Sequence, residues 1–207
     1  MKSVAARVGN VGGCLAGLAL AAGVVGCGQD LSRPETMELA RRGGVFVSYN
    51  GLGFNTMAKV AEETSDELGM VHVDGDNVQD EERLYRILGE ANVVYLGFHS
   101  KGSTHADDLV EECKKRGIDV QIAYSLDAFT SNLFPDNVRK VSNIYSSVPY
   151  VFGKQTTRGG LKKEEKTLKK TWHHNLPRSA KAFMKKGIEQ SRSEKLGYSF
   201  VPRQKSK

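Results

Sequence analysis

The feature that most constrains the fold of this chain is an almost uninterrupted apolar run at residues 92–97 (NVVYLG). Strands buried on both faces of a parallel sheet have this character, because helices cover each face. The run passes through a short polar turn into residues 104–116, which have the apolar spacing of an amphipathic helix. A buried strand that leads directly into a helix predicts an α/β fold with a mostly parallel sheet.

The same alternation of apolar runs and helical patterns continues along the chain. The predicted strands are 45–49, 70–73, 92–97, 118–126 and 138–145, and the predicted helices are 56–68, 79–88, 104–116 and 179–190. We therefore expect one three-layer α/β sandwich over residues 45–190, with residues 93–98 as a central strand. Residues 154–171 fit either a surface loop or a short exposed helix.

The first 26 residues have the layout of a secretory signal peptide. Lys2 and Arg7 precede an uncharged apolar stretch at residues 8–26. The stretch ends in Val-Val-Gly-Cys, which resembles a bacterial lipobox. The resemblance implies that the signal peptide, residues 1–26, is removed and that Cys27 carries lipid such as palmitate. We therefore expect a lipoprotein of the bacterial cell envelope, held at the membrane through Cys27.

The alternative interpretation of this stretch is an uncleaved transmembrane anchor. Five glycines between residues 9 and 23 disfavour it, because glycine is a poor helix former. Residues 27–44 are then expected to be a lipidated tether. Gly28 is not the aspartate that retains some lipoproteins at the inner membrane, so we expect outer-membrane sorting in a two-membrane bacterium. With Cys27 lipidated, Cys113 is the only thiol left in the mature chain, which excludes an intrachain disulfide.

The composition is that of an ordinary globular domain. The 207 residues are 39% hydrophobic and carry a net charge of +6, which excludes collagen-like and fully disordered chains. The charge is uneven, because residues 154–207 hold 16 Lys and Arg against 4 Asp and Glu. This region, including a basic tail at 191–207, lacks the known nucleic-acid-binding patterns. We expect a solvated basic face beside anionic lipid headgroups, and no nucleic-acid partner.

The sequence predicts no metal and no cofactor. Residues 74–77 (DGDN) resemble the start of a calcium loop, but the remaining ligands of that loop are missing, so a surface turn is expected. Zinc-ligand spacing, the dinucleotide-binding glycine pattern and the P-loop pattern are also absent from the sequence. The oligomeric state is not indicated.

The polar turn after residues 92–97 places Ser100 at the carboxyl end of a central strand, in His-Ser-Lys-Gly. Ligands bind at this edge of a parallel sheet. A serine on a tight turn there presents its hydroxyl outward, with the next N–H groups facing any oxyanion that forms. The pattern resembles the nucleophile elbow, G-x-S-x-G, of the α/β-hydrolase superfamily.

Three further segments strengthen the resemblance to small bacterial lipase- and thioesterase-like members of this superfamily. Residues 49–53 (YNGLG) resemble its glycine-rich oxyanion loop, Asp127 follows the next strand, and His173 lies just before the last helix. The order Ser, Asp, His is that of the superfamily. The resemblance implies a minimal α/β-hydrolase fold with a catalytic triad of Ser100, Asp127 and His173. It also implies an oxyanion hole built from the N–H groups of Lys101 and of Leu52 or Gly53.

Two positions leave alternatives open. His174 is a rival base to His173, and Asp136 is a rival acid to Asp127, although Pro-Asp-Asn is typical of a turn. His99 precedes the serine, as the histidine of G-H-S-x-G does, and there a structural role is expected.

Phe98 departs from the superfamily pattern, because it replaces the first glycine of G-x-S-x-G. We expect its ring either to point into a gap or to loosen the turn. Two hypotheses follow for the function. The first is a lipid-anchored serine hydrolase that cleaves a carboxylic ester or thioester. The second is a catalytically inactive α/β-hydrolase-like lipoprotein that acts as a binding module, and Phe98 is the feature that favours it.

Overall fold

A six-stranded parallel sheet forms the centre of the protein. The computed structural model describes residues 31, 33–51, 55–147, 156–157 and 162–196. The strand order is β2-β1-β3-β4-β6-β8, and each pair of neighbours is parallel. These strands are β1 (Val45–Tyr49), β2 (Val71–Asp74), β3 (Val94–His99), β4 (Val120–Leu126), β6 (Lys140–Ser146) and β8 (Lys162–Leu168). Two short strands, β5 (Leu133–Phe134) and β7 (Thr156–Thr157), pair separately.

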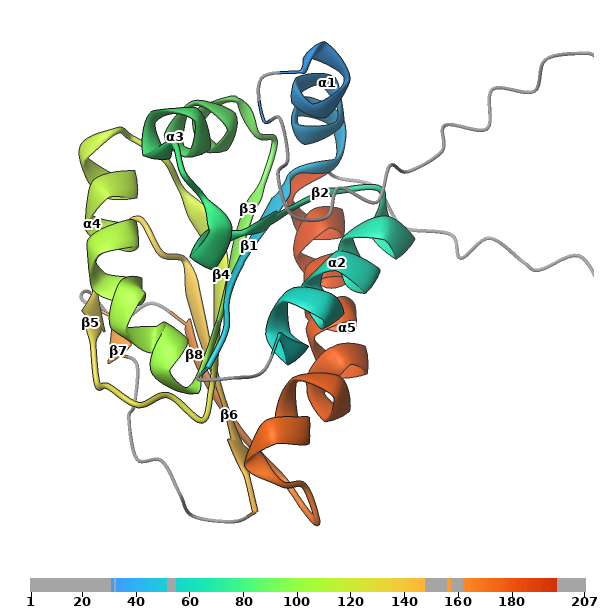
Figure 1. Ribbon diagram of the computed structural model, residues 1–207, viewed down its shortest axis with the longest axis vertical. Coiled ribbons are helices and arrows are strands. Elements are labelled where there is room, and N and C mark those ends of the chain that lie inside the picture. Colours follow the sequence, from blue (N-terminus) through green and yellow to red (C-terminus); the bar gives the residue numbers. More distant parts are fainter. Residues whose placement is uncertain (1–30, 32, 52–54, 148–155, 158–161, 197–207) are drawn as a thin grey trace, which may run out of the picture.

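Helices cover both faces of this sheet (Figure 1). The α-helices are α1 (Pro34–Gly43), α2 (Thr56–Leu68), α3 (Glu81–Glu90), α4 (Ala106–Lys115) and α5 (Leu176–Leu196), and the 3-10 helices are η1 (Gly75–Asn77), η2 (Ser100–His105) and η3 (His173–Asn175). In Figure 1, α3 and α4 lie on one side of the sheet, and α2 and α5 lie on the other. The layers are therefore helix, sheet and helix.

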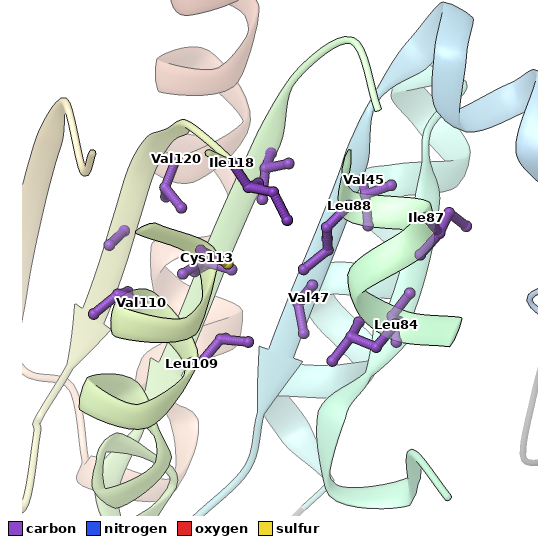
Figure 2. Packing of buried hydrophobic residues seen from close by; sticks show 14 of the residues in the cluster. Val45, Val47, Leu84, Ile87, Leu88, Leu109, Val110, Cys113, Ile118 and Val120 are labelled. Atoms are coloured by element: carbon purple, nitrogen blue, oxygen red, sulfur yellow. The ribbon is translucent and has the colours of Figure 1, made fainter. Parts of the chain in front are cut away.

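The sheet separates two apolar clusters, one for each face. Side chains of α3 and α4 pack on alternate residues of β1 and β3, and Figure 2 shows Val45 and Val47 of β1 facing Leu84 and Leu88 of α3. The second cluster joins Phe46 and the intervening strand residues to α2 and α5. Because β1 and β3 are buried on both faces, their sequences are mostly apolar and do not alternate with exposed polar residues.

The predicted three-layer α/β sandwich with a mostly parallel sheet is confirmed. Strand β3 lies inside the sheet between β1 and β4, as its apolar run predicts. All six strands run in the same direction, so the turns after β1, β3, β4 and β6 meet at one edge. That edge carries the residues singled out in the sequence.

The structure differs from the expected loop or exposed helix at residues 154–171. Part of this region, Lys162–Leu168, forms the edge strand β8 and pairs with all seven residues of β6. Its sequence, KKEEKTL, has no apolar alternation, which is why the pattern did not predict a strand. An edge strand has one neighbour only, and charged side chains there disfavour pairing with another chain. Lys140 of β6 also forms a 2.8 Å ion pair with Glu164.

Part of the expected tether, residues 27–44, is an ordered helix. Helix α1 has Pro34 in its first turn, Glu35 beside the positive end of its dipole, and Arg41 and Arg42 in its last turn. It buries Met37 and Ala40 in the core, in contact with α3. The folded unit therefore begins by residue 34, and α5 extends it to residue 196 rather than 190.

Several predictions concern residues outside the described part of the chain. The signal peptide at 1–26, the lipid attachment at Cys27 and the two loop residues Leu52 and Gly53 belong to this group. So do the last eleven residues, 197–207, of the expected basic tail. Among the described residues, no helix has both the length and the apolar character needed to cross a bilayer.

Candidate active site

Ser100 occupies a strained turn at the carboxyl end of β3. Its φ is 52°, and in the described residues only Asp127 and Lys170 are further non-glycine residues with positive φ. This conformation costs energy for a residue with a side chain, and it clusters at functional sites. Ser100 is partly exposed and begins η2, which leads into α4. The strand–turn–helix that the sequence indicated is thus present with a sharp reversal at the serine.

Two glycines allow the neighbouring backbone to approach this turn. A side chain on Gly51, which follows β1, would begin 2.8 Å from the Ser100 Cβ and 3.3 Å from its Oγ. A side chain on Gly102 would begin 2.6 Å from the carbonyl oxygens of Tyr49 and Asn50. Real Cβ atoms do not approach other atoms so closely, so both positions require glycine. The glycine-rich loop after β1 therefore starts directly against the serine.

A hydrogen-bonded polar pair fixes the start of that loop. Both the backbone N–H and the side-chain amide of Asn50 donate to Asp76, at 2.7 and 3.0 Å. The side-chain oxygen of Asn50 accepts from the Ala58 N–H in α2 at 2.9 Å. The turn at 74–77, which faintly resembles a calcium loop, thus supplies a carboxylate that holds the loop. No cluster of side chains in the described residues could hold a metal ion.

Asp127 is buried at the carboxyl end of β4 with both carboxylate oxygens engaged. Oδ1 accepts from the Ser146 N–H at 2.8 Å, and Oδ2 lies 2.9 Å from Nδ1 of His173. Its backbone N–H donates to Ile144. The side chain is only 4% exposed. The carboxylate is therefore held rigidly between the end of β6 and the histidine.

His173 lies in η3, immediately before α5, and its side chain is 23% exposed. A hydrogen bond that Nδ1–H donates to Asp127 orients the ring, which leaves Nε2 available to act as a base. The rival histidine, His174, is exposed to solvent. The rival acid, Asp136, is 70% exposed and pairs with Lys114 at 2.9 Å.

Hydrogen bonds join the loop after β4 to the serine turn. The Phe129 N–H donates to the Ser100 carbonyl at 3.1 Å and to the Ser103 hydroxyl at 3.0 Å. The Ser103 hydroxyl in turn donates to the Ser100 carbonyl at 2.8 Å. The sequence assigned no individual role to Ser103, Ser146 or Asn50, because their bonds to Phe129, Asp127 and Asp76 join segments far apart in the chain.

The structure brings Asp127 and His173 into direct contact, and Ser100 directly follows a residue that touches His173. His99, the neighbour of Ser100, contacts the His173 ring with 4.7 Å between centroids. In the described part of the chain the Ser100 hydroxyl and the His173 ring form no hydrogen bond. Such bonds are often long in unliganded enzymes and tighten when substrate binds. Lys101 follows in η2, while Leu52 and Gly53 lie outside the described residues.

Phe98 neither fills a gap loosely nor opens the turn. Its side chain is fully buried, stacks on Tyr49 at 5.8 Å and meets Phe134 at 6.2 Å between ring centroids. Its ring belongs to the apolar cluster that also contains Ala106, Leu109 and Val110 of α4. The sharp turn at Ser100 is therefore compatible with a phenylalanine at this position.

Three large apolar side chains of the described residues are exposed, and two of them, Phe129 and Trp172, belong to segments that contact or adjoin the candidate site. Phe129 is 65% exposed, Trp172 57% and Leu133 48%. Phe129 is bonded to Ser100 through its N–H, and Trp172 directly precedes His173.

Comparisons with known proteins give limited information. No protein-family model matches the sequence, and no curated protein is significantly similar to it. Among solved structures, the chain is similar to the thioesterase domain that cyclises the lipopeptide antibiotic surfactin. The TM-score is 0.45 at 11% sequence identity, and the match covers 75% of this chain and 92% of that chain. A likeness at this level says nothing about activity, which has to be argued from the residues at the sheet edge.

Proposed function

We propose that this protein is a serine hydrolase of the α/β-hydrolase type that cleaves a carboxylic ester or thioester. The observation that carries the proposal is the 2.9 Å contact between Asp127 and His173 beside the strained Ser100 turn. A buried carboxylate that orients a partly exposed imidazole, next to a serine at the ligand-binding edge of a parallel sheet, is the arrangement that nucleophilic catalysis requires.

Each residue then has one role in the reaction. Nε2 of His173 takes the proton of the Ser100 hydroxyl as its oxygen attacks the substrate carbonyl, which gives a tetrahedral oxyanion. The imidazolium, stabilised by Asp127, returns the proton to the leaving alcohol or thiol as the acyl-enzyme forms. Water then attacks the acyl-enzyme by the same steps, and Ser100 is released with its proton. The N–H of Lys101 and those of the glycine loop would hold the oxyanion, and one such donor is typically worth about 3 kcal/mol.

The inactive binding module is the weaker alternative. Phe98 is the sequence feature that favours it, and its ring is part of the packed core. Because Ser100 keeps the left-handed conformation beside this ring, Phe98 gives no reason to exclude catalysis.

A fluorophosphonate probe tests the proposed nucleophile. We expect the probe to label the purified protein at Ser100, with the mass shift located to the peptide that contains residues 99–102. Ser103→Ala is the matched control, because Ser103 lies in the same 3-10 helix but is fully buried, with its hydroxyl bonded to the Ser100 carbonyl and to Thr130. Labelling should vanish in Ser100→Ala and persist in Ser103→Ala. Labelling that survives in Ser100→Ala would contradict the proposed nucleophile.

We further propose that a lipid on Cys27 anchors this hydrolase to the bacterial envelope. The support is the uncharged stretch at residues 8–26 that ends in Val-Val-Gly-Cys. The mature protein should then begin at a diacylated Cys27, as measured by intact mass after membrane extraction. Cys27→Ala should leave the membrane fraction. An unprocessed Met1 terminus, or membrane association of Cys27→Ala, would exclude the anchor.

A further inference from the structure

His99 is a fully buried histidine between the sheet and the candidate base. It is the last residue of β3 and directly precedes Ser100. Its Nε2 lies 3.0 Å from the backbone carbonyl oxygen of His173, 74 positions further along the chain. A carbonyl oxygen only accepts hydrogen bonds, so Nε2 must carry the proton and donate. The bond therefore fixes the tautomer of His99 and ties the His173 backbone to the end of β3.

The His99 ring also supports the His173 ring directly. Their centroids are 4.7 Å apart, with 34° between the ring planes. His173 is thus held by Asp127 at Nδ1, by the His99 N–H at its backbone, and by the His99 ring against its own ring. A small misplacement of a base relative to its nucleophile can cost about 100-fold in rate, so such a support bears on catalysis.

The second ring nitrogen of His99, Nδ1, forms no hydrogen bond that would stabilise the fold. Nδ1 is buried and has no hydrogen-bond partner. It lies near the serine, because a side chain on Gly51 would begin 3.4 Å from this nitrogen and 3.3 Å from the Ser100 Oγ. A buried polar atom without a partner costs stability, and an apolar side chain would avoid that cost. Burial, together with the nearby His173, lowers the pKa of His99 to about 4. The ring is therefore neutral at the pH at which an imidazole base works, and no fixed positive charge opposes protonation of His173.

We propose that His99 is a positioning residue that sets the place of the His173 imidazole relative to Ser100, through its N–H on the His173 backbone and its ring against the His173 ring. The inference rests on the proposed hydrolase function. It assigns to His99 a part in turnover in addition to filling the core.

Two substitutions separate positioning from packing. His99→Leu keeps an apolar side chain of similar reach but removes the donor, and His99→Gln places an amide N–H where Nε2 lies. With p-nitrophenyl butyrate as substrate, kcat should fall about 10- to 100-fold in His99→Leu, with KM nearly unchanged. His99→Gln should recover most of the lost kcat. Thermal unfolding confirms that each variant is folded.

His72→Leu is the matched control. His72 is the other buried histidine of the sheet, and burial also lowers its pKa to about 4, but it lies in β2 and bonds Ser48 rather than the site. We expect this variant to lose stability and to keep its kcat. An equal loss of kcat in His72→Leu and His99→Leu would overturn the proposal, because it would show a general effect of removing a buried histidine.

A second readout does not depend on activity. The proton on Nδ1 of His173, bonded to Asp127, should give a downfield NMR resonance. We expect it to shift or broaden in His99→Leu and to be retained in His99→Gln and His72→Leu. An unchanged resonance together with wild-type kcat in His99→Leu would overturn the proposal even if Ser100→Ala is inactive. Wild-type turnover in Ser100→Ala would instead overturn the proposed function itself.

Discussion

The molecule contains two regions that each pair a serine with a histidine. The two regions differ in burial, in hydrogen bonding and in whether a carboxylate is present. In the first, Ser48 of β1 and His72 of β2 form a 2.9 Å hydrogen bond inside the sheet, with Ser48 fully buried and His72 8% exposed. In the second, Ser100 lies at the sheet edge beside His173, which is partly exposed and bonded to a carboxylate. The buried pair is directly hydrogen-bonded, whereas the edge pair has access to solvent and an acid.

The difference shows that a serine–histidine contact is not by itself a catalytic site. Ser48 and His72 are both buried, so no substrate can reach the pair. At the edge, strands end in turns, and the turn at Ser100 reverses the chain sharply enough to present the hydroxyl. The acid and the base come from two other strand ends, which the parallel sheet brings to the same place.

The strongest test of this comparison is to remove each serine hydroxyl in turn. Ser100→Ala should lower the hydrolysis of p-nitrophenyl butyrate by at least about 1,000-fold, because the nucleophile is lost. Ser48→Ala should keep near wild-type turnover but lose about 1–3 kcal/mol of unfolding free energy, because His72 loses its buried partner. Steady-state kinetics and urea unfolding measure the two effects. If Ser48→Ala were inactive while folded, the distinction between the two regions would fail.

A substitution at Phe98 tests whether the Ser100 turn at the sheet edge depends on the packing of the core beneath it. Phe98→Ala should cost about 3–5 kcal/mol in unfolding free energy, because it leaves a cavity beside Tyr49 and Phe134. Turnover of the folded fraction should not rise, because the ring does not distort the Ser100 turn. Urea unfolding and kinetics below the unfolding transition measure both. A variant that turned over substrate faster than the wild type would show that Phe98 restrains the elbow.

A fall in pH should lower the free energy of unfolding, because each of the two regions contains a buried histidine. Burial lowers the pKa of His72 and of His99 from 6.5 to about 4, so the unfolded chain binds more protons than the folded chain between these pH values. Stability should therefore be lost as the pH falls from 6.5 toward 4, on the order of 3 kcal/mol for each histidine. The loss should be smaller in His72→Leu and in His99→Leu than in the wild type. Urea unfolding at several pH values gives these differences, and parallel curves for all three proteins would contradict them.

The smallest expected effect concerns the exposed apolar residues beside the edge region. Phe129→Ser and Trp172→Ser should each lower kcat/KM for p-nitrophenyl octanoate by about 10-fold, because each buried methylene of an acyl chain contributes about 0.8 kcal/mol. The acetate ester should be affected little. Tyr85→Ser, in α3, is a control that should leave both substrates unchanged. Equal losses for octanoate and acetate would show that these side chains do not bind the acyl chain.

The local sequence predicted most of the strands and helices that form the three layers. The apolar run at 92–97 predicted a buried interior strand, because only a strand covered on both faces is apolar at every position. The helix start at Pro34 had sequence signals as well, since proline, an early glutamate and late arginines are typical of helix ends. Strand β8 could not be predicted this way, because its polar residues are tolerated only at an edge.

The sequence by itself determined the turn at Ser100, since a glycine two positions later and a strand before it are local requirements. It also determined the order of serine, aspartate and histidine along the chain. Only the tertiary structure decided that His173, rather than His174, bonds Asp127, and that Ser146, Ser103 and Asn50 hold the surrounding loops. Asp127 bonds His173 and Ser146, which lie 46 and 19 positions away along the chain. Ser103 bonds Phe129 and Asn50 bonds Asp76, each 26 positions away. A sequence pattern fixes neighbours along the chain, whereas the sheet fixes which strand ends meet, and the candidate site exists only where they meet.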